Sequence, residues 1–482
     1  MRQLVDDGSG DGEAADSGVE NANGCISHAT NRSGGCAPKP SQPSGSVAYA
    51  DQVSTALLTD QYELTMLDAA IGSGRHERPC VFEAFARRLP DSRRYGVVAG
   101  TGRLLELVEQ FRFGDDELSF LQQNKIVHPN TIDWLANYRF TGNITGYREG
   151  EAYFPGSPVL IVEGSFAEAV LLETLALSVL NYDSAVASAA ARMVSAADAR
   201  PLAEMGSRRT GERSAVASAR AAYIAGFSAT SNLEAGRSWG VPTMGTAAHS
   251  FTLLHDSEEE AFQAQVDAFG PSTTLLVDTF DVEKAVDLAV KVAGTKLGAV
   301  RIDSGDLAAQ VAAVRAQLDS LGATNTRITV TNDLDEYAIA ALRAAPVDSY
   351  GVGTSVVTGS GHPAAGMVYK LVARHNDAGE WVSVAKKSTA KATIGGHKAA
   401  VRTLEGGRAA TELIYQTSEG RPNVAGRDLI VDLMTNGSAD ARWLGHDGTF
   451  AARDHREQAL AELPQNAFRL SRGEPVVPTV YY

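Results

Sequence analysis

The segment LGAVRIDSGD (residues 297–306) decides the fold class of this chain. A short apolar run is followed by the guanidinium of Arg301 and the carboxylates of Asp303 and Asp306. A helical pattern then extends to Leu321. This order predicts a buried strand that opens into a charged loop before a helix. In α/β barrels the carboxyl ends of the strands carry the chemistry. A cation and anions at this point suit a substrate with a negative group and hydroxyls, or a bound metal; a simple helix cap is the alternative.

The same strand-then-helix order repeats on both sides of this segment. Strands are predicted at 274–277, 299–302, 327–331 and 349–352, and helices at 282–292, 307–321 and 335–344. Three successive strands end in Asp278, Asp303 and Asp333, and the fourth opens into a glycine-rich loop, which helix capping alone does not explain easily. Such repeats predict a parallel sheet, open or closed into a barrel.

The chain as a whole predicts two folded domains. One is a central parallel α/β barrel, regular or irregular, and the other is a second α/β domain built from N-terminal and C-terminal segments. Residues 1–50 are rich in small and polar residues and are expected to form a disordered tail. The expected domains are 51–180, 181–372 for the barrel, and 373–482 packing with 51–180. In the first of these, strands are predicted at 80–86 and 159–162, and helices at 56–67, 104–113, 115–123, 129–138, 166–180 and, continuing into the barrel, 184–199.

Composition narrows the class of protein. The chain has 482 residues and a formal net charge of −15, which disfavours broad attraction to nucleic acid or an anionic membrane. We expect no membrane span and no signal peptide, because no long apolar run is present. Three cysteines, at 25, 36 and 80, are too few and scattered for a disulfide framework or a zinc site. A cytoplasmic protein fits best.

Several local patterns suggest anion binding. The loop at 350–355 offers unobstructed backbone N–H groups and hydroxyls for a phosphate monoester, or it is only a tight turn. It contains no Walker lysine and no G-x-G-x-x-G pattern. Arg208 and Arg209 open a stretch that also contains Arg213 and Arg220, and these arginines could bind phosphate or carboxylate in a forked geometry, or lie on a solvated helix face. The lysines of 386–398 could be a binding loop or a solubilising run. His249 lies among small residues, where it is either structural or chemical, depending on nearby carboxylates.

Taken together, six ordered segments resemble nicotinate phosphoribosyltransferase, of the type II phosphoribosyltransferase family. They are 57–66 (LLTDQYELTM), 206–209 (GSRR), 245–251 (GTAAHSF), 300–306 (VRIDSGD), 331–336 (TNDLDE) and 351–356 (GVGTSV). The resemblance covers about 55 to 400 and does not include the first 50 residues. Each segment alone is a modest match to the family, but the set of six in this order is a highly specific one.

The resemblance implies a reaction and an assembly. Nicotinate and 5-phosphoribosyl 1-pyrophosphate would give nicotinate mononucleotide and pyrophosphate with inversion at C1′, in NAD salvage. ATP as co-substrate would be hydrolysed through phosphorylated His249, and Mg²⁺ would accompany the pyrophosphate. The implied partners are these substrates and a second copy of the chain, in a homodimer with shared active sites. The metal ligands are not identified.

The resemblance also implies residue roles. His249, Asp278, Asp303 and Arg301 form the catalytic set, in which the aspartates orient ribose hydroxyls, metal or the His249 ring. The implied substrate-binding residues are Tyr62 (stacked on the pyridine ring from the partner subunit), Arg208 (with Arg301 on the carboxylate and nearby phosphates), Ser231, Thr246 and Ser250 (flanking the histidine), Asp333 (ribose or metal), and Gly353 and Thr354 (5′-phosphate).

Two alternatives accompany this assignment. A nicotinamide- or quinolinate-specific transferase would share most motifs. However, Ser231 matches a position at which the nicotinamide-using relative looks to have an Asp. Because a serine does not repel the nicotinate carboxylate, it favours nicotinate. A catalytically silent nucleotide-binding barrel is the other alternative, and the presence of His249 and the aspartates argues against it. Met205 departs from the family's frequent Phe, and Gly395-Gly396 departs from Pro-Gly.

Overall fold

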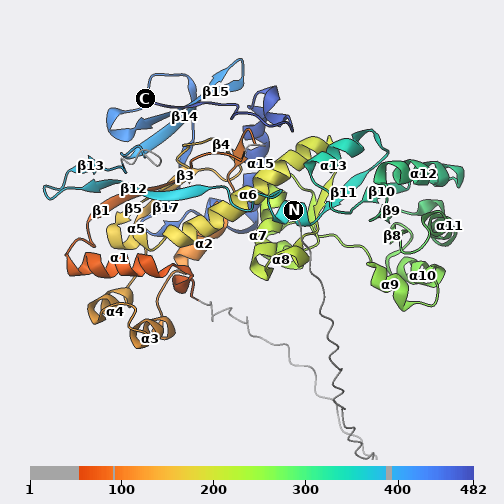
Figure 1. Ribbon diagram of the computed structural model, residues 1–482, viewed down its shortest axis with the longest axis horizontal. Coiled ribbons are helices and arrows are strands. Elements are labelled where there is room, and N and C mark those ends of the chain that lie inside the picture. The colour runs from red at the N-terminus through yellow and green to blue at the C-terminus, as the bar shows by residue number, and fades with distance from the viewer. Residues whose placement is uncertain (1–53, 91–92, 387–392) are drawn as a thin grey trace, which may run out of the picture. The chain divides into compact units, whose positions relative to one another are not determined.

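The computed structural model describes residues 54–90, 93–386 and 393–482 as one compact unit. The expected tail at 1–50 and the lysines at 387 and 391 lie outside the described residues. Within the described part, a parallel sheet and an antiparallel sheet each build a hydrophobic core (Figure 1).

The parallel sheet has six strands in the order β7-β6-β11-β10-β9-β8. These strands are β6 (Leu202–Glu204), β7 (Ala229–Thr230), β8 (Thr274–Leu276), β9 (Ala299–Ile302), β10 (Arg327–Val330) and β11 (Ser349–Val352). Apolar residues at 275, 300, 328 and 330 are fully buried in the first core, as the near-continuous apolar runs of a parallel sheet require.

The prediction of a parallel α/β sheet is confirmed, but the sheet is a half-barrel and not a complete barrel. Strands β7 and β8 stand at the two ends of the strand order. Between them the chain forms α8 (Leu233–Trp239), α9 (His249–Leu254) and α10 (Glu258–Phe269), with only an isolated bridge between Thr230 and Thr243. Because this segment supplies helices where a closed barrel needs more strands, the described sheet stays open.

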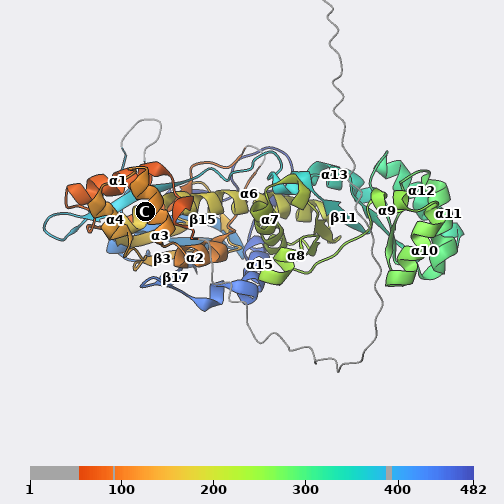
Figure 2. The same ribbon diagram turned by 90° about the horizontal axis from the view of Figure 1, so that it is seen from below.

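Helices connect successive strands of the half-barrel. They are α7 (Glu212–Ile224), α11 (Val282–Ala293), α12 (Leu307–Ser320) and α13 (Glu336–Ala341), and the short α14 (Thr354–Val357) follows the last strand, β11. Helices α10, α11 and α12 pack side by side on the outside (Figure 2). The side chains of Asp281, Asp306 and Asp335 accept N–H groups of the first turns of α11, α12 and α13. Helix capping therefore uses aspartates that follow the strand-end aspartates, which leaves Asp278, Asp303 and Asp333 for other contacts.

The antiparallel sheet joins the two ends of the described chain. Its order is β13-β12-β1-β5-β3-β17-β18. The strands are β1 (Pro79–Ala86), β3 (Asn143–Tyr147), β5 (Leu160–Ser165), β12 (Met367–His375), β13 (Trp381–Ser383), β17 (Ile430–Thr435) and β18 (Ser438–Ala439). Helices α1 (Gln61–Gly72), α2 (Thr101–Glu109), α3 (Asp115–Gln123) and α4 (Pro129–Leu135) precede or interrupt it.

A smaller C-terminal sheet, β16-β14-β15-β19, rests on buried charge. Its strands are β14 (Lys398–Glu405), β15 (Arg408–Gln416), β16 (Gly426–Asp428) and β19 (Thr479–Tyr481), and α15 (Gly445–Ala461) follows β18. Arg402 lies between Glu151 and Glu412, 2.6 Å from an Oε2 of Glu412, and all three side chains are at most 1% exposed. Tyr147 also donates to Glu412, at 2.6 Å. Breaking such a buried ion pair leaves an uncompensated charge.

One long helix belongs to both cores. Helix α6 (Glu173–Ala197) places its first half, around Val179, in the core of the antiparallel sheet and its second half, around Ala190, in the core of the half-barrel. The prediction of a helix break near 181–183 is wrong: the break lies at 171–172, after α5 (Phe166–Val170). Polar residues continue the helix because tertiary contacts satisfy them, as when the buried Asp183 accepts from Arg103 at 2.8 Å.

The segment Phe166–Ala197 is also long and apolar enough to cross a membrane by length and composition, contrary to the expectation from sequence. However, 67% of its most apolar window is buried inside the protein. Its apolar surface is therefore used for packing two cores together.

Candidate functional site

Two adjoining cavities lie where β6, β9, β10 and β11 end. Their volumes are about 150 and 310 Å³, and both are lined by Met205, Arg208, Arg301 and Asp303. Together they fall in the range of small-molecule sites. The first is completed by residues 209, 331–333, 351, 353 and 354, and the second by 207, 231, 245–249 and 276. The loops after successive parallel strands therefore form one continuous site.

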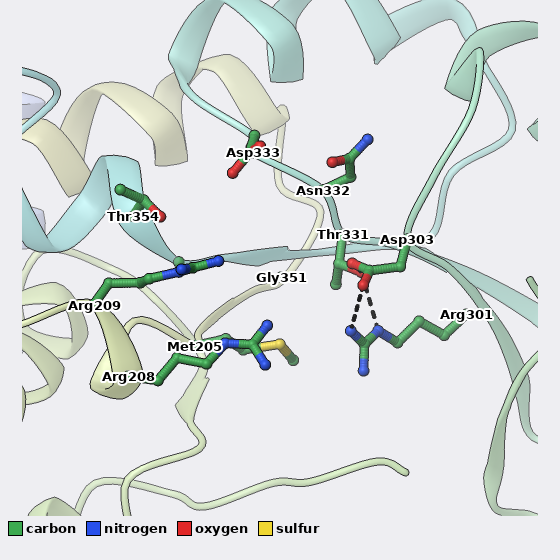
Figure 3. Close-up of a pocket in the computed structure, with 11 residues that line it drawn as sticks. Met205, Arg208, Arg209, Arg301, Asp303, Thr331, Asn332, Asp333, Gly351 and Thr354 are labelled. Carbon is green, nitrogen blue, oxygen red and sulfur yellow. Dashed lines mark hydrogen bonds and ion pairs between the residues drawn. The ribbon is translucent and has the colours of Figure 1, made fainter. Parts of the chain in front are cut away.

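The first cavity is rich in groups suited to a phosphate. Arg208 and Arg209 extend into it from one side, and Arg301 and Asp303 lie across from them (Figure 3). Among the described residues, neither the Arg208 nor the Arg209 guanidinium has a hydrogen-bond or ion-pair partner, so both can bind a ligand. Thr354 begins α14, whose first N–H groups have no helical partner. Backbone N–H groups at such a point favour anions.

The loop after β10 reaches this cavity with an unusual backbone. Asn332 has φ of 100° and Asp333 has φ of 41°, in the left-handed region that non-glycine residues avoid. Both side chains are exposed and line the cavity. Strained backbone of this kind persists only where surrounding structure holds it.

Arg301 and Asp303 occupy the boundary between the cavities and are fixed by a shared hydroxyl. Arg301 donates through Nε to Thr331 Oγ1 at 3.0 Å and through a terminal nitrogen to Thr246 Oγ1 at 2.9 Å. Its other terminal nitrogen lies 3.3 Å from Asp303 Oδ2. Thr331 in turn donates to Asp303. Both charges are thus held in place while part of each still faces the cavity.

The second cavity places His249 against two carboxylates. His249 Nε2 is 3.9 Å from Asp278 Oδ1 and 3.9 Å from Asp303 Oδ2, and Nδ1 is 3.1 Å from Thr279 Oγ1. The imidazole is 42% exposed, whereas Asp278 is 1% exposed. Asp278 Oδ2 accepts the N–H of Asp303 at 2.8 Å, and Oδ1 has no hydrogen-bond partner among the described residues. A buried carboxylate oxygen without a partner among the described residues therefore lies next to an accessible imidazole.

A buried carboxylate supports the turn that carries the two arginines. Glu204, at the end of β6, accepts the N–H of Gly206 at 2.5 Å and the hydroxyl of Thr230 at 2.6 Å. Burial raises the pKa of Glu204. Gly206 has no room for a side chain: an added Cβ would lie 2.2 Å from Val357 Cγ1 and 2.9 Å from the Gly353 carbonyl oxygen. The arginine turn and the loop after β11 therefore touch at Gly206.

Most of the residues predicted for the site meet here. Arg208, Ser231, Thr246, His249, Arg301, Asp303, Asp333, Gly353 and Thr354 line one or both cavities, and Asp278 lies directly behind His249. Ser250 is exposed on α9 and lines neither cavity.

Tyr62 also lines neither cavity of this chain. It lies on α1, 45% exposed, where burial and the nearby Glu173 raise its pKa to about 12. Its predicted contact comes from a partner subunit, so it stays a prediction.

Two basic residues singled out from the sequence are structural. Arg220 is fully buried in a two-bonded pair with Glu149, at 2.6 and 2.8 Å, and stacks on Trp239. Lys398 is buried 2.9 Å from Glu83 and does not face either cavity.

Other residues of the site were not among the predicted ones. They are Asn332, Thr331, Thr279 and Glu204. Asn332 adjoins the predicted Asp333, and this adjacency was the available signal. No sequence signal identified Glu204, because the pattern of a carboxylate at a strand end is the same whether the residue supports a turn or binds a ligand.

Comparison with known proteins agrees with this geometry. The family model for the nicotinate phosphoribosyltransferase (NAPRTase) N-terminal domain matches residues 57–181, and that for the NAPRTase family matches residues 201–415. The chain is 56% identical over 440 residues to the Mycobacterium tuberculosis nicotinate phosphoribosyltransferase pncB1, covering 89% of this chain and 96% of the relative. It is 40% identical over 419 residues to pncB2 of the same organism, covering 85% and 88%.

Solved structures give the same result. The crystal structure of human nicotinic acid phosphoribosyltransferase superposes with a TM-score of 0.75 at 25% identity, covering 88% of this chain and 97% of that chain. A nicotinate-nucleotide pyrophosphorylase from Pyrococcus furiosus has a TM-score of 0.69 at 21% identity, covering 89% of this chain and 99% of that chain, which shows a shared fold. With family models across most of its length and a relative at 56% identity, this chain belongs to the nicotinate phosphoribosyltransferase family.

Proposed function

We propose that this chain transfers the phosphoribosyl group of 5-phosphoribosyl 1-pyrophosphate to nicotinate, in NAD salvage. The observation that carries the proposal is the continuous site in which unpaired arginines, a helix start and strand-end aspartates converge. The pyridine nitrogen forms a bond to C1′ while the bond from C1′ to the pyrophosphate oxygen breaks, with inversion. The products are nicotinate mononucleotide and pyrophosphate.

Charge in the site suits the transition state of this reaction. An oxocarbenium-like ribose is stabilised by Asp303 and Asp333, and the departing pyrophosphate by arginines. In this proposal Gly353 and Thr354 bind the 5′-phosphate, and Arg208 and Arg301 bind the nicotinate carboxylate and nearby phosphates. The contact between Arg301 and Asp303 holds both charges in a fixed geometry before a ligand binds.

The base is nicotinate in this proposal. Ser231 lines the second cavity and introduces no negative charge. A serine therefore does not repel the nicotinate carboxylate, which an aspartate would. Tyr62 of a partner subunit would stack on the ring, in a homodimer with shared sites.

ATP hydrolysis is coupled, in this proposal, through phosphorylated His249. Its imidazole is accessible, and Asp278 and Asp303 flank one nitrogen. These carboxylates orient the ring, while Thr246 hydrogen-bonds the ligand or Arg301. Ser250 lines neither cavity, so its predicted contact with the ligand would require α9 to rearrange.

Mg²⁺ fits the cavity as a companion of pyrophosphate. Among the described residues no group of three or more His, Cys, Asp or Glu could hold a metal by itself. Mg²⁺ in such sites needs only one or two carboxylates besides substrate phosphates, and Asp303 and Asp333 line the cavity that would receive them. When bound, the ion would neutralise charge on the leaving pyrophosphate.

Strand pairing supports a proposal for domain organisation. Strand β3 pairs with β17, which supports one domain built from 51–180 and 373–482 beside a catalytic domain over 181–372. Strand β12 pairs with β1 but begins at Met367, so the boundary at 372 falls inside this strand. We also assign the enzyme to the cytoplasm.

Release of pyrophosphate by the pure protein tests the function. It should require both nicotinate and 5-phosphoribosyl 1-pyrophosphate, with ATP raising the rate. Competition among nicotinate, nicotinamide and quinolinate identifies the base. No release with any base, with or without ATP, would refute the proposal, and preferred use of nicotinamide would refute the role given to Ser231.

A further inference from the structure

Two loops that line the first cavity are joined beneath it by one buried carboxylate. The loop after β10 supplies Asn332 and Asp333, and the loop after β11 supplies Gly353 and Thr354. Glu336, which begins α13 at the end of the first loop, is 2% exposed. Its Oε2 accepts the hydroxyl of Ser360, in the second loop, at 2.7 Å. The carboxylate thus spans the two loops outside the strand ladder.

The same carboxylate is anchored to the core helix. Arg192, on α6, donates through Nε to Glu336 Oε1 at 3.0 Å, and the two side chains are 6% and 3% exposed. Arg192 also donates to the Leu470 carbonyl at 3.2 Å. This ion pair therefore ties Glu336 to a helix that is packed in both cores.

The second loop needs such support. Ser360 has φ of 52°, in the left-handed region that is unfavourable for serine. Its N–H donates to the Ser355 carbonyl at 2.7 Å, which closes the turn that follows α14. A second buried cation acts on the adjacent residue: Arg93 donates to the Gly359 carbonyl, and to the Ala185 carbonyl on α6 at 3.0 Å. The loop is therefore held at two consecutive residues by groups tied to α6.

We propose that Glu336 is a positioning residue, which through Ser360 sets the spacing between the loop after β10 and the phosphate-binding loop after β11. The inference rests on the proposed function, because it takes the 5′-phosphate of the ribosyl substrate as the ligand of Gly353 and Thr354. Glu336 itself lines neither cavity. It acts by keeping the strained Asn332–Asp333 segment and the start of α14 at the separation that one phosphoribosyl group spans.

The position of Arg192 makes a purely structural role the main alternative. A buried ion pair can stabilise a fold without affecting any ligand. The two roles predict different effects on ligand binding when the contact between Glu336 and Ser360 is removed. In a positioning role, only the binding of the 5′-phosphate is weakened. If the fold is loosened, the binding of every ligand is weakened.

Ribose 5-phosphate and pyrophosphate, titrated separately by calorimetry, distinguish these roles. Ser360→Ala and Ser360→Gly both remove the hydroxyl, but glycine also relieves the left-handed strain, so an effect shared by both belongs to the hydrogen bond. Glu336→Gln tests the carboxylate directly. Glu412→Gln breaks a buried ion pair of the C-terminal sheet, away from the cavity, and is the matched control.

We expect the Kd for ribose 5-phosphate to rise about tenfold in both Ser360 variants and in Glu336→Gln, the loss typical of a hydrogen bond to a charged group. The Kd for pyrophosphate should stay unchanged. In activity assays the KM for 5-phosphoribosyl 1-pyrophosphate should rise in the same variants while the KM for nicotinate does not. Glu412→Gln should lower the melting temperature and leave both dissociation constants unchanged.

An unchanged Kd for ribose 5-phosphate in the Ser360 variants, or a parallel rise for both ligands, would overturn the positioning role. So would a wild-type protein that does not bind ribose 5-phosphate. A failure of the proposed function is separate: wild-type protein would then bind ribose 5-phosphate but release no pyrophosphate with nicotinate.

Discussion

Replacement of Gly206 by alanine tests whether the turn that carries Arg208 and Arg209 must touch the loop after β11. Gly206 has φ of −93° and ψ of 1°, a conformation open to alanine, so the substitution adds no backbone strain. Its added methyl would lie 2.2 Å from Val357 Cγ1, about 1.3 Å inside the roughly 3.5 Å at which two carbons make favourable contact. Val357 is 2% exposed and packed in the core, so it cannot rotate away.

The turn that carries Arg208 and Arg209 must therefore move by about 1 Å. A misplacement of this size costs on the order of a hundredfold in rate, which is about 2.7 kcal/mol of transition-state stabilisation. Overpacking should also lower the free energy of unfolding by about 1–3 kcal/mol.

Gly211→Ala is the matched control, at the other end of the same turn. There an added Cβ would meet nothing closer than Ser214 Oγ at 3.9 Å, and φ is −63°. Pyrophosphate release is measured for both variants with each substrate varied, and thermal unfolding is followed by circular dichroism. We expect kcat/KM to fall in Gly206→Ala and to stay near wild type in Gly211→Ala. Equal kcat/KM in the two variants would refute the packing argument.

Four further outcomes follow from the structure. His249→Ala should abolish stimulation of pyrophosphate release by ATP and leave basal transfer, and intact stimulation would exclude the phosphohistidine. Ser231→Asp should raise the KM for nicotinate about tenfold or more, because it places a second anion beside a carboxylate; an unchanged KM would remove Ser231 from the base site. Glu412→Gln should lower the free energy of unfolding by about 3 kcal/mol, since Arg402 loses a fully buried partner; denaturation by urea measures this, and no loss would mean that Glu151 alone balances Arg402. Burial raises the pKa of Glu63 from 4.5 to about 7. Between these pH values the folded protein therefore retains a proton that the unfolded chain has released. The contribution of Glu63 to the stability of the fold is complete at low pH and falls as the pH rises from 4.5 to 7. Glu63→Gln should remove that part of the slope of unfolding free energy against pH, and a slope equal to that of wild type would contradict the assignment.

The half-barrel could be predicted from sequence because its local signals are strong. The predicted bounds of the strands at 299–302 and 349–352 match β9 and β11, since each is a short apolar run between polar turns. Predicted residues such as Arg301, Asp303 and Thr354 meet in the cavity because parallel strands align their carboxyl ends at one edge.

Other features depend on contacts between distant segments, which local patterns do not contain. The break predicted near 181–183 reflected polar residues that Arg103 and a strand backbone satisfy inside α6. Arg220 was grouped with the ligand-binding arginines because its partner, Glu149, lies 71 positions away in the chain. Closure of the barrel depends on whether the segment between β7 and β8 pairs with its neighbours, and periodicity does not determine pairing.

The antiparallel sheet also dictates an order of events during synthesis. Strands β1, β5 and β3 pair with one another, and the outer edges of this trio are covered by β12 on one side and β17 on the other. Translation at about 5–20 residues per second separates the end of β3, at Tyr147, from the start of β17, at Ile430, by roughly 15–60 s. Throughout that interval the nascent chain presents unpaired strand edges, which are templates for aggregation. Expression yield should therefore fall when ribosome-bound chaperones are removed.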